Sequence, residues 1–369
     1  MVQRQVKYVT VVPALRATGL VAEVYAQVAE EMRLVVPPAM LHSPAPDVLA
    51  GYWALLREPL AADGVDRAAK EAAAAAVSIA NICPYCADMH TVGMYDLSGE
   101  HDAEAVAADR IEEVADPRLR AVAAWARTAH QSDDRAPAPA DLTAAQRAEL
   151  VGVVVAFHYV ARMVNVFLSN YLLPPGLSPR SRRRLKQGIS RILRPTLREP
   201  RRAGRATALL PAAPAGTGPR WVDGQPEVAR AFAAAYRVFD AAAERSVPPV
   251  VRRLVQDRLA AWRGEETGLS TQWCERLLVD LTPADAAAGR LALLTALASY
   301  RIDQEVVGEF RRHHPDDRTL VDLTAWASAT AAAVVGERCA AEWPAVPSDA
   351  GERKHAERRG TRPAAGIVD

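Results

Sequence analysis

Apolar residues recur along the chain at the three- and four-residue spacing of amphipathic helices, in blocks separated by Pro, Gly and charged residues. Such spacing lets each helix bury one face and leave the other in water. The pattern predicts helices in the first half over residues 19–34, 46–60, 66–81, 84–97, 117–132 and 142–168. It predicts helices in the second half over residues 226–243, 248–263, 271–280, 283–300, 304–312 and 318–340.

The composition favours an all-α fold. Alanine, the strongest helix former, is abundant, whereas the aromatic residues that favour strands make up only 6% of the chain. The 369 residues are enough for two domains with buried cores. The formal net charge of +1 gives no overall field that would attract nucleic acid, so we expect no nucleic-acid partner.

Neither a membrane span nor a secretory leader is evident. The longest apolar stretch, residues 151–168, is interrupted by His158, Arg162 and Asn165, and no apolar run of signal-peptide length follows the first charges. Four cysteines, two of them only three positions apart, do not make a secreted disulfide framework. We expect a soluble cytoplasmic protein without a membrane partner, whose cysteine pair serves redox or metal chemistry.

Residues 173–219 differ in composition from the segments on either side. They are rich in Pro and Gly at both ends and strongly basic in the middle, where Glu199 alone opposes the positive charge. We therefore expect a first domain over residues 1–172, a basic linker over 173–219 and a second domain over 220–346. Residues 347–369 mix charge, Pro and Gly without periodicity, which predicts a disordered tail.

The basic segment also holds apolar residues at helical spacing and no interleaved aromatic residues. These residues are Leu185, Ile189, Ile192 and Leu193. A solvated helix that covers the first domain explains this pattern better than a surface for nucleic acid or anionic lipid.

The second half repeats the order of the first at low similarity. An Ala-rich helix leads into Val36-Pro37-Pro38 in the first half and into Val247-Pro248-Pro249 in the second. If Cys83 is aligned with Tyr300, then Cys86 falls on Asp303 and His90 on Val307. We therefore expect a duplicated helical domain whose second copy keeps the fold and lacks the cysteine pair.

The chemistry concentrates in one segment with Glu71, Cys83, Cys86 and His90. Pro84 is typical of the first position of a helix, so Cys83 becomes the cap and Cys86 lies in the first turn. The helix dipole and the free N–H groups there would lower the pKa of a nucleophilic cysteine. His90 lies four residues beyond Cys86 on the same helical face, where it can exchange a proton with the sulfur.

Glu71 lies too far along its own helix to reach Cys83, since twelve helical residues span roughly 18 Å. If the two helices fold back as an antiparallel pair about Ile82, Glu71 returns to the level of His90. A proton relay from Glu71 through His90 to Cys86, direct or through water, is then geometrically allowed. The sequence alone leaves this relay open.

Three other interpretations of the CxxC pair differ in their fit. A c-type haem site needs His directly after the second cysteine, where Ala87 stands, so haem is excluded. Zinc would use Cys83, Cys86 and His90, but no neighbouring Cys or His pair closes the site, and we expect no metal. Cys-Pro-Tyr-Cys also occurs in glutaredoxins, whose fold needs a strand before it, whereas residues 72–76 are all alanine and favour a helix.

These residues resemble the alkylhydroperoxidase D-like proteins of the carboxymuconolactone decarboxylase superfamily. The family signature is Glu, eleven residues, Cys-x-x-Cys, three residues and His, and this sequence matches every spacing. The resemblance covers most of residues 36–173, and includes residues 77–81 and the segment from Ala156 to Asn165. It implies a fold of duplicated alkylhydroperoxidase D-like helical bundle domains.

The resemblance also implies roles for the motif residues. Cys86 would attack a hydroperoxide, Cys83 would resolve the sulfenic acid as a disulfide, and Glu71 with His90 would form the proton relay. Tyr85 departs from the best-known family member, which has an additional histidine between the cysteines. The family further implies that an external dithiol, a lipoyl group or a thioredoxin-like protein, reduces the disulfide, with no bound cofactor.

A polar stripe crosses the apolar helix predicted over residues 142–168. His158, Arg162 and Asn165 lie at i, i+4 and i+7, on one face of that helix. They could line, with Tyr85, a substrate pocket over Cys86, or they could satisfy loop carbonyls or hold a subunit contact. The sequence supports both interpretations equally.

The leading hypothesis is a thiol-dependent alkyl hydroperoxide reductase that works as a homo-oligomer. A second hypothesis, of a different class, is a helical scaffold whose CxxC pair senses oxidants without turnover. Lactone decarboxylation is suggested only by the name of the superfamily, and the presence of both cysteines favours redox chemistry.

Overall fold

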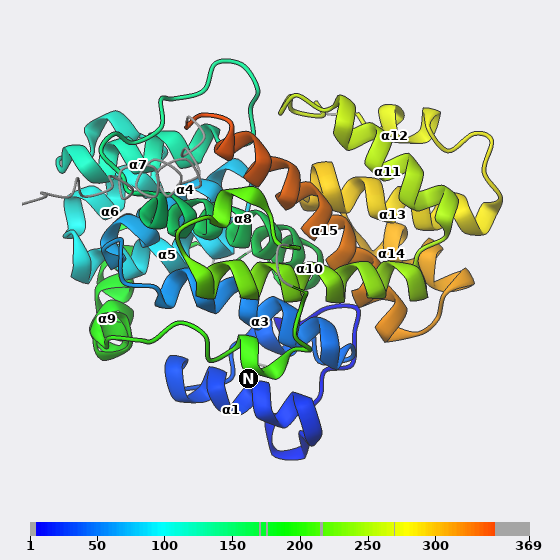
Figure 1. The fold of residues 1–369 in the computed structure, drawn as a ribbon, viewed down its shortest axis with the longest axis horizontal. Helices are drawn as coiled ribbons and strands as arrows, with labels where there is room; N and C mark the ends of the chain where they lie inside the picture. Colours follow the sequence, from blue (N-terminus) through cyan, green and yellow to red (C-terminus); the bar gives the residue numbers. More distant parts are fainter. Residues whose placement is uncertain (1–4, 170, 175, 215–216, 269, 344–369) are drawn as a thin grey trace, which may run out of the picture.

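The computed structural model describes residues 5–169, 171–174, 176–214, 217–268 and 270–343. Within these ranges the chain forms α-helices and short 3-10 helices, and the sole β-type pairing is an isolated bridge between Val6 and Leu168. The fold is all-α, as the sequence predicts (Figure 1). The tail predicted over residues 347–369 lies outside the described residues.

Most helices follow one another with short connections, and the longest connection, residues 199–225, lies between α9 and α10. In the first half they are α1 (Gly19–Met32), α2 (Pro37–Met40), α3 (Pro46–Ala61), α4 (Arg67–Ala80), α5 (Pro84–Leu97), α6 (Glu100–Ala107), α7 (Pro117–Thr128) and α8 (Ala144–Phe167). The later ones are α9 (Pro179–Arg198), α10 (Pro226–Ser246), α11 (Pro249–Ala261), α12 (Gln272–Arg276), α13 (Pro283–Ala298), α14 (Gln304–His313) and α15 (Asp317–Ala340). Short 3-10 helices include η5 (Arg220–Val222) and η6 (Ser299–Arg301).

Seven of the fifteen α-helices in the described part of the chain begin at residues whose side chains accept hydrogen bonds from the first free N–H groups. Thr143 accepts from Gln146 N, and the Gln146 side chain accepts from Thr143 N, so α8 begins with a complete capping box. The same role falls to Asp66, Asp116, Ser178, Thr282, Asp303 and Asp316 at the starts of α4, α7, α9, α13, α14 and α15. These caps explain why helix starts are easily predicted from this sequence.

The two halves share one continuous apolar core. The long helices α8 and α15 pack against each other in the middle of the molecule, and α10 packs against α3 and α15 (Figure 1). The helices α4 to α7 lie at one end, and α11 to α14 lie at the other. The domain boundaries near residues 172 and 219 therefore stay a prediction. They would divide two repeats that share one core.

Two helices, α8 and α15, are long and apolar enough to cross a membrane by length and composition alone. Their most apolar windows are 100% and 78% buried inside the molecule, respectively. Burial of this kind is typical of the central helices of a protein core, and it explains their composition without a bilayer.

The segment predicted as a basic linker contains the 20-residue helix α9, which is the helix expected there. Its inner face meets acidic residues of the first half: Lys186 pairs with Asp88 and Glu104, and Arg182 donates to Asp88. Because α9 packs against α5, the basic helix covers the outer side of the helix that begins at the cysteines.

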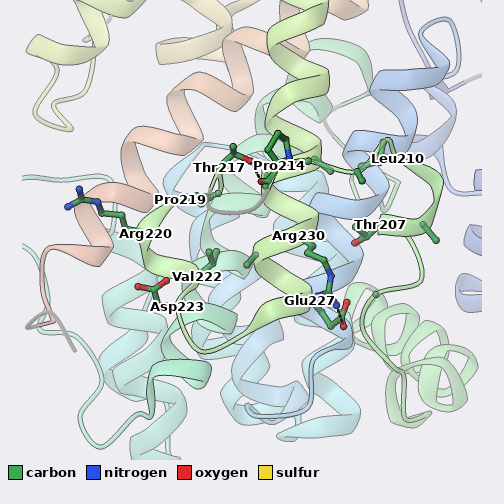
Figure 2. A pocket seen from close by; sticks show the side chains of 18 residues that line it. Thr207, Leu210, Pro214, Thr217, Pro219, Arg220, Val222, Asp223, Glu227 and Arg230 are labelled. Atoms are coloured by element: carbon green, nitrogen blue, oxygen red, sulfur yellow. Dashed lines mark hydrogen bonds and ion pairs between the residues drawn. The ribbon is translucent and has the colours of Figure 1, made fainter. Parts of the chain in front are cut away.

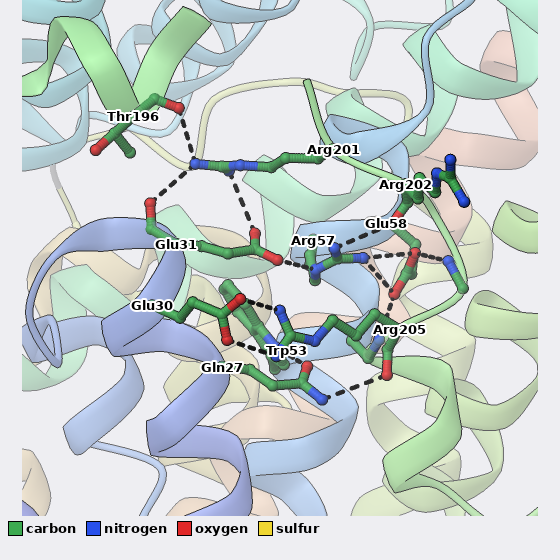
Figure 3. A network of polar contacts seen from close by, with 12 residues as sticks. Gln27, Glu30, Glu31, Trp53, Arg57, Glu58, Thr196, Arg201, Arg202 and Arg205 are labelled. Atoms are coloured by element: carbon green, nitrogen blue, oxygen red, sulfur yellow. Dashed lines mark hydrogen bonds and ion pairs between the residues drawn. The ribbon is translucent and has the colours of Figure 1, made fainter. Parts of the chain in front are cut away.

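A buried charge network fixes the chain after α9. Arg57 on α3 bonds to Glu31 of α1 and to its neighbour Glu58, which is fully buried. Glu58 also accepts from the backbone N–H groups of Gly204 and Ala206, and Arg201 pairs with Glu31 (Figure 3). Each charge has an opposite partner, as buried ionic groups require, so the network ties the segment to α1 and α3.

The second half repeats the helix order of the first without its cysteine pair. The helices α13 and α14 pack on each other and α13 packs on α15, as α4 packs on α5 and on α8. Counted from the helix start, however, Asp303 and not Tyr300 occupies the place of Cys83, because η6 lengthens the connection. The residue in the place of Cys86 is then Val306, and the alignment predicted from sequence is shifted by three positions.

Candidate active site

A strained turn joins α4 to α5 and carries the first cysteine. Ile82 has a φ of +51°, in the left-handed region that β-branched residues rarely adopt. The Ile82 N–H donates to Ile79 O, and the Cys83 N–H donates to Ser78 O at 2.9 Å. The turn reverses the chain, so α5 runs back along α4 as an antiparallel partner.

The polar stripe of α8 holds this turn in place. Asn165 Nδ2 donates to the Asn81 carbonyl at 2.9 Å, and Asn81 Nδ2 donates to His158 Nδ1 at 2.9 Å. Asn165 Nδ2 also donates to Ser299 Oγ in the second half. The stripe therefore satisfies loop groups, which was one of the two interpretations open from the sequence.

Cys83 and Cys86 lie at the start of α5 as free, buried thiols. Cys83 is the N-cap residue but makes no side-chain cap hydrogen bond. The side chain of Cys83 and burial raise the pKa of the Cys86 thiol. This direction corrects the lowering expected from the helix dipole, because the sequence did not reveal that the thiol is shielded from water.

Glu71 and His90 are in direct contact across the α4–α5 pair. His90 Nδ1 and Glu71 Oε2 are 2.7 Å apart, and Arg67 Nε donates to Glu71 Oε1 at 2.7 Å. Gly93 permits this closeness, because a Cβ there would lie 3.1 Å from Glu71 Oε2. Since Glu71 accepts the Nδ1 proton, the other ring nitrogen, Nε2, is left with its lone pair.

The Glu71 carboxylate is ionised in this setting. Burial acts to raise its pKa, but the charges of Arg67 and His90 and their hydrogen bonds lower the pKa of Glu71 to about 2. Arg67 was not singled out from the sequence. Its place four residues before Glu71, at the spacing of a helical ion pair, is the signal that could have identified it.

Two tyrosines lie beside the cysteine pair. Burial, followed by the charges of Cys86 and Cys83, raises the pKa of Tyr85. Burial, with Cys86 and Tyr85, raises the pKa of Tyr52 on α3, whose ring stacks on His42 at 4.3 Å. Both phenols therefore keep their protons at neutral pH. No sequence pattern identified Tyr52, because it comes from a different helix.

The four residues predicted to line a substrate pocket do not gather around one cavity. His158 and Arg162 line a cavity of about 150 Å³ whose wall also includes Asn81 and Ile82. Tyr85 lies by the cysteines, and Asn165 supports the turn from behind. Neither Cys83 nor Cys86 is among the residues that line this cavity.

A larger cavity lies elsewhere in the molecule. It has a volume of about 850 Å³ and lies between α10 and the chain that leads to it, with Thr207, Leu210, Arg220 and Glu227 in its wall (Figure 2). The described residues that line it include no cysteine and no histidine. It has no connection with the motif residues.

Within the described part of the chain, no group of three or more His, Cys, Asp or Glu side chains is arranged to hold a metal ion. Cys274 lies in α12 and Cys339 in α15, both free and buried. Burial raises the pKa of each of these two thiols to about 12, so both keep their protons at neutral pH.

Comparison with known proteins places the chain in a family. Residues 46–128, which span α3 to α7, match the model of the carboxymuconolactone decarboxylase family. The chain is 36% identical over 333 residues to alkyl hydroperoxide reductase Rv2159c of Mycobacterium tuberculosis (strain ATCC 25618 / H37Rv), covering 90% of this chain and 94% of that protein. No solved structure matches the chain. The chain therefore belongs to the carboxymuconolactone decarboxylase family, among its alkylhydroperoxidase D-like proteins.

Proposed function

We propose that the protein is a thiol-dependent hydroperoxide reductase that uses Cys86 and Cys83 as its redox pair. The observation that carries the proposal is the hydrogen bond from His90 to the ionised Glu71. His90 lies on α5, the helix whose first turn holds Cys86. The name of its relative from Mycobacterium tuberculosis, an alkyl hydroperoxide reductase, supports the same reaction class.

The raised pKa of Cys86 gives His90 a defined task. A thiol that keeps its proton at neutral pH needs a general base before it can attack. The lone pair on His90 Nε2 can accept that proton, and Glu71 stabilises the imidazolium that results. His90 lies one helical turn beyond Cys86, so both side chains belong to the same face of α5.

The proposed reaction has two chemical steps in the protein. The Cys86 thiolate attacks the terminal oxygen of the hydroperoxide, the O–O bond breaks, and the departing alkoxide takes a proton from His90 to leave as an alcohol. The Cys83 sulfur then attacks the Cys86 sulfenic acid, which forms the Cys83–Cys86 disulfide and releases water. One hydroperoxide is reduced for each dithiol oxidised.

An external dithiol then restores the two thiols by exchange with the disulfide. We propose a dihydrolipoyl group or a thioredoxin-like protein in this role, with no cofactor bound to the chain. Reduction of the oxidised protein can be followed with a lipoylated carrier, thioredoxin and glutathione. Equal rates with all three would refute a preference for the lipoyl group.

The proposed function is tested by steady-state consumption of tert-butyl hydroperoxide with dihydrolipoamide as reductant. With the reductant present, we expect many turnovers per protein molecule. Without the reductant, peroxide consumption should stop after one equivalent. A protein that reacts once and cannot be recycled by any dithiol would instead be a redox sensor. Stoichiometric zinc in the reduced protein, lost on substitution of either cysteine, would contradict the proposal.

A further inference from the structure

A small polar cavity borders the turn before Cys83, and neither Cys83 nor Cys86 is in its wall. Its volume is about 150 Å³, and it is enclosed by parts of both halves of the chain. From the first half come Asn81, Ile82, His130, His158 and Arg162. From the second half come Trp262, residues 264–267 and residues around Tyr300.

Arg162 is a buried cation without an anionic partner. Its guanidinium donates through Nε to Ala296 O at 2.9 Å and through Nη1 to His158 O at 2.6 Å. Among the described residues it forms no ion pair, and no hydrogen bond from Nη2 occurs. Burial lowers the pKa of Arg162 to about 9, and no acidic group counteracts this effect. The guanidinium is therefore charged at neutral pH and uncompensated, which is costly in a protein interior.

His158 presents a second unused donor. Its Nδ1 accepts from Asn81 Nδ2 and Arg162 Nη1, both of which are donors, so Nδ1 carries no proton. Burial and the charge of Arg162 hold the pKa of His158 well below its usual range, and the neutral ring must carry its proton on Nε2. Within the described residues this buried Nε2 has no hydrogen-bond partner.

The interior of the cavity is electropositive. Burial and the charges of four arginines lower the pKa of His130 to about 4, and these are Arg162, Arg127, Arg338 and Arg135. Glu265 and Glu266 also line the cavity, but both are exposed to solvent, and Glu265 already accepts from Arg258. Positive charge therefore lies deep in the cavity and negative charge lies at its outer side. This arrangement favours an anion with a single charge.

We propose that this cavity binds the carboxylate of a small organic monoacid, with Arg162 Nη2 and His158 Nε2 as its donors. A carboxylate can accept from Nη2, since Nε and Nη1 already donate within the protein, and it would supply the missing counter-charge. The volume corresponds to about five water molecules, so the acid carries only a short chain. The proposal does not depend on the reductase activity, although the ligand would lie against Asn81 and Ile82 in the cysteine turn.

The test uses propionate and its uncharged analogue propionamide as probes on the full-length protein. Trp262 lines the cavity, so its indole N–H signal in a ¹⁵N–¹H spectrum, assigned with Trp262→Phe, reports on occupancy. We expect this signal to shift with saturation at millimolar propionate and to stay in place with propionamide. The other six tryptophans serve as internal references.

Two arginine variants separate a specific site from a general charge effect. Arg162→Met should weaken propionate binding by about tenfold or more, because it removes the buried partner of the carboxylate. Arg290→Met is the control and should change binding little, because Arg290 is not in the cavity wall and already pairs with Glu275 and Glu309. Equal losses in both variants would overturn the assignment of Arg162.

The comparison of propionate with propionamide in the unmodified protein tests whether the cavity recognises a carboxylate, even if Arg162→Met fails to fold. Equal shifts of the Trp262 signal with propionate and propionamide would show that the cavity does not recognise the carboxylate. Equal shifts with the same concentration of chloride would also overturn the proposal. Because none of these measurements involves peroxide, failure here and failure of the proposed reductase function are distinguishable.

Discussion

The helix pairs α4–α5 and α13–α14 occupy matching places in the two halves, yet their second helices begin in opposite ways. At the start of α14, the Asp303 side chain accepts from Glu305 N and Val306 N, both at 3.0 Å. At the start of α5, Cys83 offers no side-chain cap, and the N–H groups of Tyr85 and Cys86 lack one. The same helical frame thus supports a well-capped helix in one half and an uncapped one in the other.

The difference shows how a reactive pair is accommodated in this fold. A good cap contributes about 1 kcal/mol to stability, and α5 lacks it because a thiol stands at its N-cap position. The turn before it is also strained, and α8 holds it with Asn165 and His158. In the second half a standard cap replaces the cysteine, in keeping with a copy that keeps only the fold.

Removal of the thiols should have the largest effect on the difference between the two halves. Cys86→Ser should abolish peroxide consumption, because the attacking sulfur is lost. Cys83→Ser should consume about one equivalent and then stall as a sulfenic acid that a dimedone-type probe traps. Peroxide assays and mass spectrometry of the trapped adduct measure both outcomes.

The matched controls come from the second half. Cys274→Ser and Cys339→Ser should keep full turnover, because both thiols lie outside the CxxC pair and keep their protons at neutral pH. The opposite result for the pair, an inert Cys83→Ser and a sulfenic acid on Cys86→Ser, would reverse the assigned roles.

Removal of the proton relay should have the next largest effect. His90→Ala and Glu71→Ala should each slow peroxide reduction by roughly 10²-fold, the contribution of a general acid–base group. Glu275→Gln, which breaks an ion pair with Arg290 in the second half, is the control and should leave the rate unchanged. A full rate for His90→Ala at neutral pH would refute the relay.

The sequence predicts the helix bounds around the site well and its tertiary contacts poorly. The predicted helix over residues 84–97 matches α5 because Pro84 marks its first position. The helix α6 was not predicted, because its eight residues follow Gly99 and are too short for a clear apolar period. Local signals therefore give the frame that carries the motif.

What the sequence lacks are the contacts between distant helices. The bond from Asn165 to the Asn81 carbonyl joins residues 84 positions apart, and no spacing rule connects them. The direction of the Cys86 pKa shift depends first on the Cys83 side chain and then on burial, and both follow from packing rather than from the helix position. The spacing of the motif predicted which residues gather, but only the packing defines their environment.

The pH dependence of stability isolates the Glu71 carboxylate. Its folded-state pKa of about 2 lies below its usual value, so ionised Glu71 stabilises the fold fully above about pH 4.5 and less as the pH falls toward 2. The difference in unfolding free energy between the wild type and Glu71→Gln should shrink by on the order of 2 kcal/mol from pH 7 to pH 3. Urea titrations at several pH values measure it, and a constant difference would contradict the depressed pKa.

Support of the cysteine turn by α8 should show in both stability and chemistry. Asn165→Ala removes the bonds to Asn81 and Ser299 and should cost about 1–3 kcal/mol, because a buried carbonyl loses its donor. It should also slow formation of the Cys83–Cys86 disulfide, which a purely structural loss elsewhere would not change. Thr330→Ala, which removes a hydroxyl bonded within its own helix α15, is the control. Equal rates of disulfide formation in both variants would show that support of the turn by Asn165 does not affect the cysteine chemistry.

The smallest effect tests the capping contrast itself. Asp303→Ala should lower the unfolding free energy by about 1 kcal/mol without affecting turnover, because α14 loses the acceptor for its first N–H groups. Cys83→Ser gives α5 a capping hydroxyl at the equivalent position and should raise stability by up to about 1 kcal/mol while it blocks turnover. Thermal unfolding of the reduced proteins measures both shifts. A stability loss in Cys83→Ser would mean that the thiol stabilises the start of α5 by its packing, and that the two helix starts differ in more than their caps.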